Sequence, residues 1–136
     1  MNGQLEHVNV RVKDIEETLR FLTTALPNFE VRGGKHRDDD SWEWVHVGTD
    51  STYLCLNEDR CDAQAKEGPG LNHVGFVVDD AESVRSRLEK AGYREGYVPE
   101  RHPHRTRVYY IDDNETEWEF VEYYSNDSSE RNDYTQ

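Results

Sequence analysis

Two histidines in a repeated segment are the side chains best suited to chemistry. His7 lies in LEHVNV and His73 in LNHVGF, each near the start of an alternating apolar run. Alternation puts successive side chains on opposite faces of a strand, so both histidines face away from the apolar side. Glu119 takes the same side of the later run EWEFVEYY. Two imidazoles and a carboxylate, with open positions beside them, suit Fe, Mn, Ni or Zn. The alternative is that both histidines are half-exposed residues inherited from an ancestral module.

The repeat extends well beyond the histidines. Residues 5–25 and 71–91 are identical at eight of twenty-one positions at an offset of 66. Each copy is an alternating run followed by a helix, which begins at Asp14 or Asp80 and ends near Pro27 or Gly92. Self-similarity of this kind indicates a duplicated structural unit.

Three strand-like runs follow each predicted helix, so each module is predicted to be βαβββ. Two such modules form an α+β protein with a curved mixed sheet and the helices on its outer face. We predict one domain over 1–124, with modules at about 5–58 and 71–124, loops at 33–40 and 58–70, and a disordered tail at 125–136. The predicted strands after the helices cover 29–32, 41–47, 52–57, 94–98, 106–111 and 117–124.

The charge limits the possible partners. A formal net charge of −13 argues against nucleic acid and against an anionic membrane surface, because both require a basic face. No apolar stretch is long enough to span a bilayer, and the two cysteines do not form a disulfide framework. We therefore expect a soluble cytoplasmic protein.

Four further residues are candidates for contact with a small substrate. Trp44 and His46 share one face of SWEWVHV and form an aromatic wall, although such tryptophans can equally fill a dimer contact. Alignment of the last strands by their apolar pairs places Cys55 where the second module has Glu119; a lone strand cysteine is more often a packing residue. Arg107 can meet an anionic substrate or balance nearby carboxylates.

The segments LEHVNV, LNHVGFVVDD and EWEFVEY resemble the vicinal oxygen chelate superfamily, from about Leu5 to Tyr124. Glyoxalase I, bleomycin and fosfomycin resistance proteins and extradiol dioxygenases belong to that superfamily. The resemblance implies a glyoxalase-like fold, a divalent metal on His7, His73 and Glu119, and a small oxygen-bearing substrate. Glyoxalase I has a second glutamate where this chain has Cys55, which argues against glyoxalase I activity.

The resemblance leaves several functions open. HPHRTRVYYIDDNETEWE is similar to the extradiol dioxygenase signature, which implies an acid/base role for His102 and a substrate hydrogen bond from Tyr109. We predict a metal-dependent lyase or isomerase, or a ring-cleaving dioxygenase. The alternatives are a fosfomycin-type thiol transferase and a non-catalytic protein that sequesters a small molecule, as bleomycin resistance proteins do. Unpaired sheet edges predict a homodimer.

Overall fold

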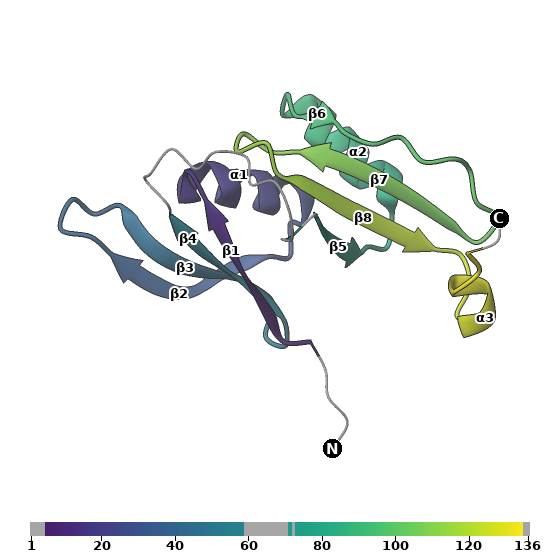
Figure 1. Ribbon diagram of the computed structural model, residues 1–136, viewed down its shortest axis with the longest axis horizontal. Helices are drawn as coiled ribbons and strands as arrows, with labels where there is room; N and C mark the ends of the chain where they lie inside the picture. Colours follow the sequence, from purple (N-terminus) through teal and green to yellow (C-terminus); the bar gives the residue numbers. More distant parts are fainter. Residues whose placement is uncertain (1–4, 59–70, 72, 135–136) are drawn as a thin grey trace, which may run out of the picture. The chain divides into compact units, whose positions relative to one another are not determined.

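The computed structural model describes residues 5–58, 71 and 73–134 (Figure 1). The chain divides into two compact units, Met1–Pro69 and Gly70–Gln136, and each contains one predicted module. This confirms the α+β class with two βαβββ modules, in the form of two four-stranded mixed sheets. The assignment of both modules to one domain over 1–124 stays a prediction. Of the linker predicted at 58–70, Glu58 ends a strand and residues 59–70 lie outside the described residues.

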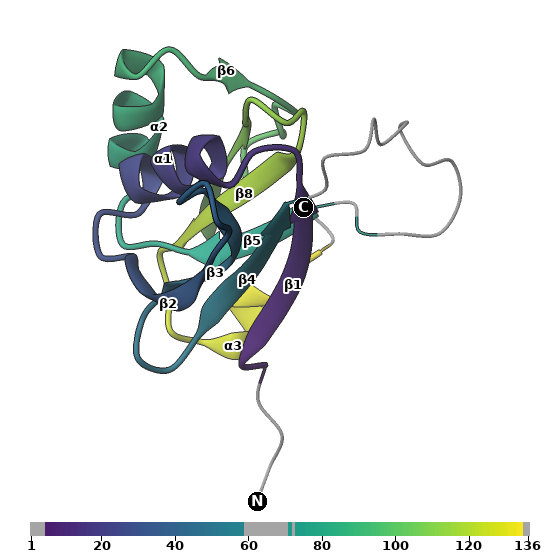
Figure 2. The same cartoon turned by 90° about the vertical axis from the view of Figure 1, so that its left-hand side faces the viewer.

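The first unit contains one sheet and one helix. Its sheet has the strand order β1-β4-β3-β2, with β1 parallel to β4 and the other pairs antiparallel. Helix α1 contacts β3 and β4, and Figure 2 shows β1 and β4 side by side. The elements are β1 (His7–Val12), α1 (Ile15–Ala25), β2 (Glu30–His36), β3 (Trp42–Gly48) and β4 (Tyr53–Glu58).

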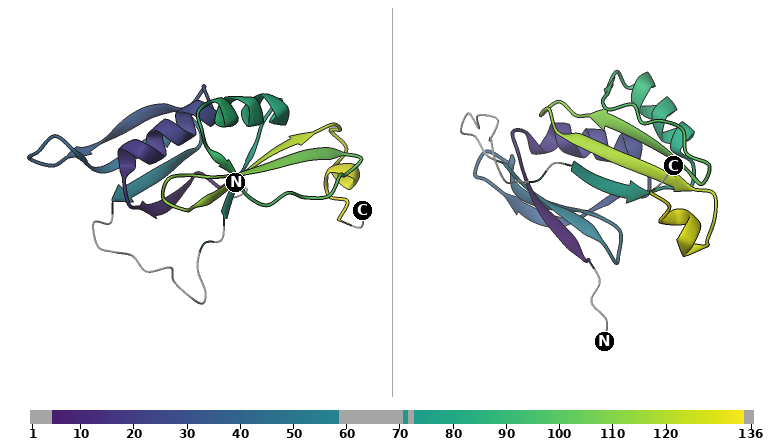
Figure 3. Two further views of the ribbon diagram at one scale, coloured as in Figure 1. Left: turned by 90° about the horizontal axis from the view of Figure 1, so that it is seen from above. Right: turned by 45° about the vertical axis from the view of Figure 1, so that its right-hand side comes forward.

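The second unit repeats this order. Its sheet runs β5-β8-β7-β6, again with one parallel pair, β5 with β8. Helix α2 contacts β6, β7 and β8, and a short helix α3 follows the sheet (Figure 3). The elements are β5 (His73–Val77), α2 (Ala81–Lys90), β6 (Arg94–Glu95), β7 (Arg105–Ile111), β8 (Glu117–Tyr123) and α3 (Ser128–Arg131).

Carboxylates at two equivalent positions cap the main helix of each unit. The N-cap Asp14 accepts a hydrogen bond from the Glu17 amide, and Asp80 accepts one from the Ser83 amide. Each helix also uses a glutamate at the end of its last strand: Glu58 accepts from the Ile15 amide at 3.3 Å, and Glu122 accepts from the Ala81 amide at 3.0 Å. These bonds satisfy amides that the first helical turn leaves without intrahelical partners.

Alternation along the strands separates a core face from an open face. In the second unit Val108, Tyr110, Trp118 and Phe120 are fully buried, and Phe76 stacks on the rings of Trp118 and Phe120. In the first unit the corresponding buried side chains include Val10, Val12, Val45 and Leu56. The histidines of β1 and β5 therefore lie on the open faces, as the alternation predicted.

Some boundaries differ from the prediction. Strand β2 continues to His36, where a loop was predicted from residue 33, because Gly33 and Gly34 pair with His46 and Val45 of β3, after a register shift that follows Val31. A Cβ at Gly34 would lie 2.5 Å from the Trp44 carbonyl oxygen, so a glycine is required there. Strand β6 has only two residues, Arg94 and Glu95, where 94–98 was predicted.

The C-terminal segment has more structure than its composition indicates. A disordered tail was predicted over 125–136, whereas residues 128–131 form α3 and Asp127 caps it. Arg131 places its guanidinium carbon 4.4 Å from the Tyr123 ring centroid. Within the described residues, no helix is both long and apolar enough to cross a membrane.

Candidate metal site

His73 and Glu119 meet on the open face of the second sheet. Strand β5 carries His73 and the neighbouring β8 carries Glu119, which lies beside Gly75 in the parallel register. A Cβ at Gly75 would lie 3.4 Å from Glu119 Oε2, an ordinary van der Waals distance, so the carboxylate lies directly beside this glycine. Glu119 Oε2 lies 3.1 Å from His73 Nε2, and their side chains are 16% and 34% exposed.

Tyr109 completes this group from the next strand. It pairs with Glu119 in the β7–β8 register, and its ring meets the His73 ring edge-on at 5.7 Å. Burial raises the pKa of Tyr109 to about 12, and the nearby Glu119 carboxylate adds to the effect because a phenolate there would be repelled. The Arg107 guanidinium lies 3.5 Å from the Tyr109 hydroxyl oxygen. Tyr109 is therefore a neutral phenol at physiological pH.

The His73–Glu119 pair has a geometry that suits a metal ion. Metal–nitrogen and metal–oxygen bonds of about 2.1 Å at a right angle would separate the two donor atoms by about 3.0 Å. The observed separation is 3.1 Å. Within the described ranges, no three His, Cys, Asp or Glu side chains gather closely enough to hold an ion, and His7 belongs to the first unit. The structure thus brings together two of the three predicted ligands.

His7 is held by its own neighbours in the first unit. Its Nδ1 lies 2.8 Å from Glu6 Oε1, and its ring stacks on Tyr53 with 4.9 Å between centroids. The Tyr53 hydroxyl donates to the same Glu6 oxygen at 3.3 Å, and Arg32 lies 4.1 Å from the Tyr53 ring centroid. The hydrogen bonds from His7 and Tyr53 lower the pKa of Glu6. Glu6, Arg32 and Tyr53 were not among the predicted site residues.

The other candidates of the first unit lie near His7. His46 lies 4.7 Å from Tyr53 and 5.0 Å from Trp44 between ring centroids, so the predicted aromatic wall exists and includes Tyr53. Cys55 is buried and pairs with His46 in the register. Burial raises the pKa of the Cys55 thiol, although the Asn57 amide at 3.5 Å partly offsets this.

The registers reveal which residues are equivalent in the two units. Cys55 pairs with His46 as Glu119 pairs with Tyr109, and Trp44 pairs with Asn57 as Arg107 pairs with Val121. Cys55 thus occupies the Glu119 position, and His46 occupies the Tyr109 position. The open face of one unit carries an acid and a phenol where the other carries a thiol and an imidazole.

The His102 ring is held by backbone groups on both of its nitrogens. Its Nδ1 accepts the His104 amide at 3.1 Å, and its Nε2 lies 2.9 Å from the Asp133 carbonyl oxygen. Both ring nitrogens therefore bond to backbone, with Nδ1 as the acceptor. Arg105 donates to the carbonyls of Arg131 and Asp133. A catalytic role for His102 stays a prediction, and the structure does not bring it to the His73–Glu119 pair.

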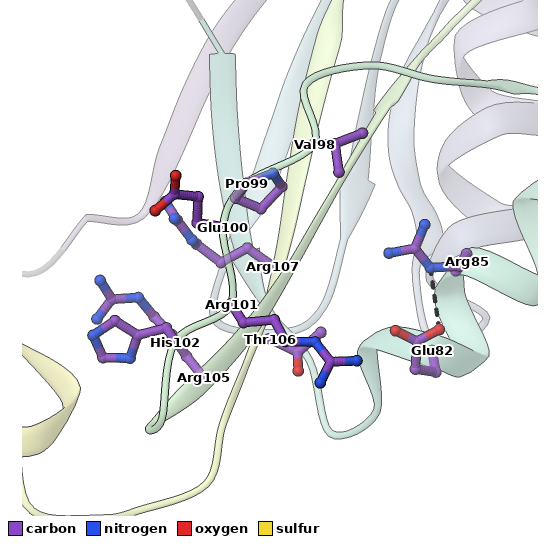
Figure 4. Close-up of a pocket in the computed structure, with 10 residues that line it drawn as sticks. All are labelled: Glu82, Arg85, Val98, Pro99, Glu100, Arg101, His102, Arg105, Thr106 and Arg107. Atoms are coloured by element: carbon purple, nitrogen blue, oxygen red, sulfur yellow. Dashed lines mark hydrogen bonds and ion pairs between the residues drawn. The ribbon is translucent and has the colours of Figure 1, made fainter. Parts of the chain in front are cut away.

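A cavity of about 380 Å³ lies beside these residues in the second unit (Figure 4). Arg85 forms ion pairs with Glu82 and Glu95. In the part of the chain that the structure describes, Arg101 and Arg107 have no carboxylate partner, although the chain is strongly acidic. The lining of the cavity includes Glu82, Arg85, Glu100, Arg101, His102, Arg105 and Arg107.

Comparison with known proteins identifies the family. The model of the Glyoxalase/Bleomycin resistance protein/Dioxygenase superfamily matches residues 4–120. The chain belongs to this superfamily. No curated protein sequence matches the chain. The vicinal oxygen chelate resemblance is therefore confirmed.

Solved structures of other superfamily members have the same fold. A fosfomycin resistance protein, FosX, from Listeria monocytogenes, complexed with Mn(II) and sulfate, has a TM-score of 0.68 and 19% identity over 96% of this chain and 98% of its own. A glyoxylase/bleomycin resistance protein/dioxygenase domain from Frankia sp. EAN1pec has a TM-score of 0.70 and 21% identity over 90% and 99%. The trypanothione-dependent glyoxalase I of Leishmania major has a TM-score of 0.68 and 19% identity, over 89% of this chain and 87% of its own. At these identities the likeness establishes the fold alone.

Proposed function

We propose that this superfamily member is a metal-dependent enzyme acting on a small oxygen-bearing substrate. The metal ligands would be His7, His73 and Glu119. The observation that carries the proposal is the 3.1 Å separation of His73 Nε2 and Glu119 Oε2 on an open sheet face. If His73 and Glu119 were a purely structural pair, they would be expected on the opposite, core face of the sheet, among the apolar side chains.

A bound Fe, Mn, Ni or Zn ion would supply Lewis acidity and open positions for one or two substrate oxygens. Tyr109, neutral at physiological pH, can donate a hydrogen bond to an oxygen of the substrate. Trp44 and His46 offer a flat apolar surface to a ring or alkyl group. Each of these side chains orients a substrate.

The candidate reactions are those of a lyase, an isomerase or a ring-cleaving dioxygenase. Glyoxalase I activity is disfavoured, because Cys55 stands where that enzyme has a second glutamate. Cys55 is also buried with a raised pKa, so its thiol is a poor proton shuttle at neutral pH. A homodimer is supported by exposed valines on the edge strands, Val31 on β2 and Val77 on β5.

The test is metal uptake followed by elemental analysis. Purified protein is incubated separately with Mn(II), Fe(II), Ni(II) and Zn(II), desalted, and analysed for metal per chain. We expect near-stoichiometric uptake of at least one metal. Glu119→Gln keeps the side-chain shape but removes the charge and should abolish uptake. The matched control is Glu100→Ala, an exposed glutamate of the same unit, which should bind metal as the unchanged protein does.

Uptake of Fe(II) in preference to the other three metals would favour ring cleavage, because two histidines and one carboxylate with open positions suit Fe(II) oxygenases. Uptake of the other metals does not separate the remaining reactions, because affinity for them follows the general order of the divalent metals. Equal uptake by Glu119→Gln and the unchanged protein would refute the ligand set. Absence of uptake for all four metals would refute the enzyme and favour the sequestering protein.

A fosfomycin-type thiol transferase is the second candidate. The observation that favours it is the cavity with Arg101 and Arg107, two guanidinium groups with no carboxylate partner among the described residues. A phosphonate would satisfy such groups through charge-assisted hydrogen bonds. The test is loss of fosfomycin in the presence of Mn(II) and a thiol. Turnover that Arg107→Met removes would favour this candidate, and no turnover would exclude it.

A further inference from the structure

The carboxylate of Glu6 fixes the ring of His7. Glu6 Oε1 lies 2.8 Å from His7 Nδ1, and the Tyr53 hydroxyl donates to the same oxygen at 3.3 Å. An ionised carboxylate only accepts hydrogen bonds, so the proton of this bond belongs to Nδ1. The neutral imidazole then carries its lone pair on Nε2, which has no partner within the described residues.

Two further contacts hold the plane of the ring. Tyr53 lies opposite His7 in the parallel register of β1 and β4, and its ring stacks on the imidazole with an interplanar angle of 14°. The backbone supports the arrangement, because the Tyr53 amide donates to the Glu6 carbonyl at 3.0 Å. Glu6 and Tyr53 together restrain both the tautomer of His7 and the direction of its Nε2 lone pair.

We infer that Glu6 is a positioning residue that holds His7 in the Nδ1–H tautomer and so presents Nε2 as a metal ligand. The inference rests on the proposed metal-dependent function. A half-exposed pair of this kind contributes little to stability, whereas the bond at one ring nitrogen decides what the other can bind. A histidine that binds a metal usually donates its other ring N–H to a carboxylate or carbonyl.

The second unit has a related arrangement. His73 also directs Nε2 toward the proposed ligand partner, Glu119. The two histidines of the repeat would therefore ligate through the same nitrogen. They differ in what precedes them, because His73 follows Asn72 where His7 follows Glu6.

The first measurement is the tautomer of His7 in metal-free protein, by long-range proton–nitrogen NMR at a pH above the ordinary imidazole pKa. We expect the Nδ1–H pattern in the unchanged protein and its loss in Glu6→Ala. Glu6→Gln should retain it, because the amide oxygen can accept the same bond. The control Glu30→Ala removes an exposed glutamate of the same unit and should leave the pattern unchanged.

The second measurement is Mn(II) affinity by calorimetry on the same four proteins, with far-UV circular dichroism as the check on folding. Loss of a carboxylate partner of this kind weakens metal binding by about 10-fold or more. We expect that loss in Glu6→Ala, a smaller loss in Glu6→Gln and no change in Glu30→Ala.

The outcomes separate the two proposals. Metal binding in the unchanged protein with the same tautomer or affinity in Glu6→Ala overturns the positioning role alone. Failure of the unchanged protein to bind any of Mn(II), Fe(II), Ni(II) and Zn(II) overturns the proposed function, and the positioning role with it. If the Glu6→Ala protein does not fold, Glu6→Gln decides. An altered His7 tautomer in Glu6→Gln together with an unchanged Mn(II) affinity also refutes the role.

Discussion

Asp112→Asn should destabilise the hairpin that carries Tyr109 and Glu119. Asp112 is 3% exposed and lies in the turn between β7 and β8. Its Oδ2 accepts the indole N–H of Trp118 at 3.0 Å, and Oδ1 accepts the amides of Asn114 and Thr116 at 2.8 and 3.0 Å. Asparagine has one acceptor oxygen, so it can serve the turn amides or the indole but not both.

The magnitude follows from what is left unsatisfied. Trp118 is fully buried, and a buried donor without an acceptor costs about 1–3 kcal/mol. The lost charge assistance acts in the same direction, so we expect Asp112→Asn to lower the free energy of unfolding by about 2 kcal/mol. Urea denaturation followed by far-UV circular dichroism measures this difference, with the slope of the transition as the check on two-state behaviour.

A double-mutant cycle with Trp118→Phe isolates the indole bond. Phenylalanine has no N–H, so Asp112→Asn should cost less than about 1 kcal/mol on that background. Trp118→Phe opens a cavity, but this cost is the same in the Trp118→Phe protein and in the Asp112→Asn, Trp118→Phe double variant, so it cancels in the comparison. An equal cost of Asp112→Asn on both backgrounds would refute the reasoning and assign the stability to the turn amides.

Three other predictions concern the frame and the open face. Glu122→Gln removes the charge of the acceptor for the Ala81 amide and should lower the free energy of unfolding by about 1 kcal/mol, measured by urea denaturation. Tyr109 and Tyr110 both have a pKa raised to about 12, chiefly by burial, so stability should be complete below pH 10 and fall as pH rises toward 12. Thermal melts across that range should show a smaller fall in Tyr110→Phe, and an identical fall would contradict the assignment. Arg107→Met should weaken binding of inorganic phosphate at least fivefold in calorimetry while metal uptake stays unchanged; unchanged phosphate binding would contradict an anion-binding role.

Much of the frame follows from local patterns. The repeat at an offset of 66 and the alternation of apolar residues were enough to predict both modules and the open-face positions of His7 and His73. Alignment of the last strands also predicted that Cys55 and Glu119 are equivalent, which the registers bear out. These features depend on near neighbours and on a period of two, which one sequence displays directly.

The remainder depends on contacts between distant segments. The environment of His102 comes from the carbonyl oxygen of Asp133, and no side-chain pattern encodes a backbone acceptor 31 residues away. Glu6 precedes a strand in an acidic chain and resembles a solvated charge until its distance to His7 is known. The extension of β2 through Gly33 and Gly34 follows from pairing with β3, although glycine pairs are typical of loops.

The carboxylates of Glu58 and Glu122, which each join the last strand of a unit to the start of its main helix, have a consequence for how this chain can evolve. They join helix to sheet from the ends of the strands, so this connection does not depend on which side chains occupy the open face. Substitutions on that face can change the chemistry without removing these two helix–sheet bonds. One half of the duplicated chain could therefore exchange a carboxylate for a thiol while its architecture persisted.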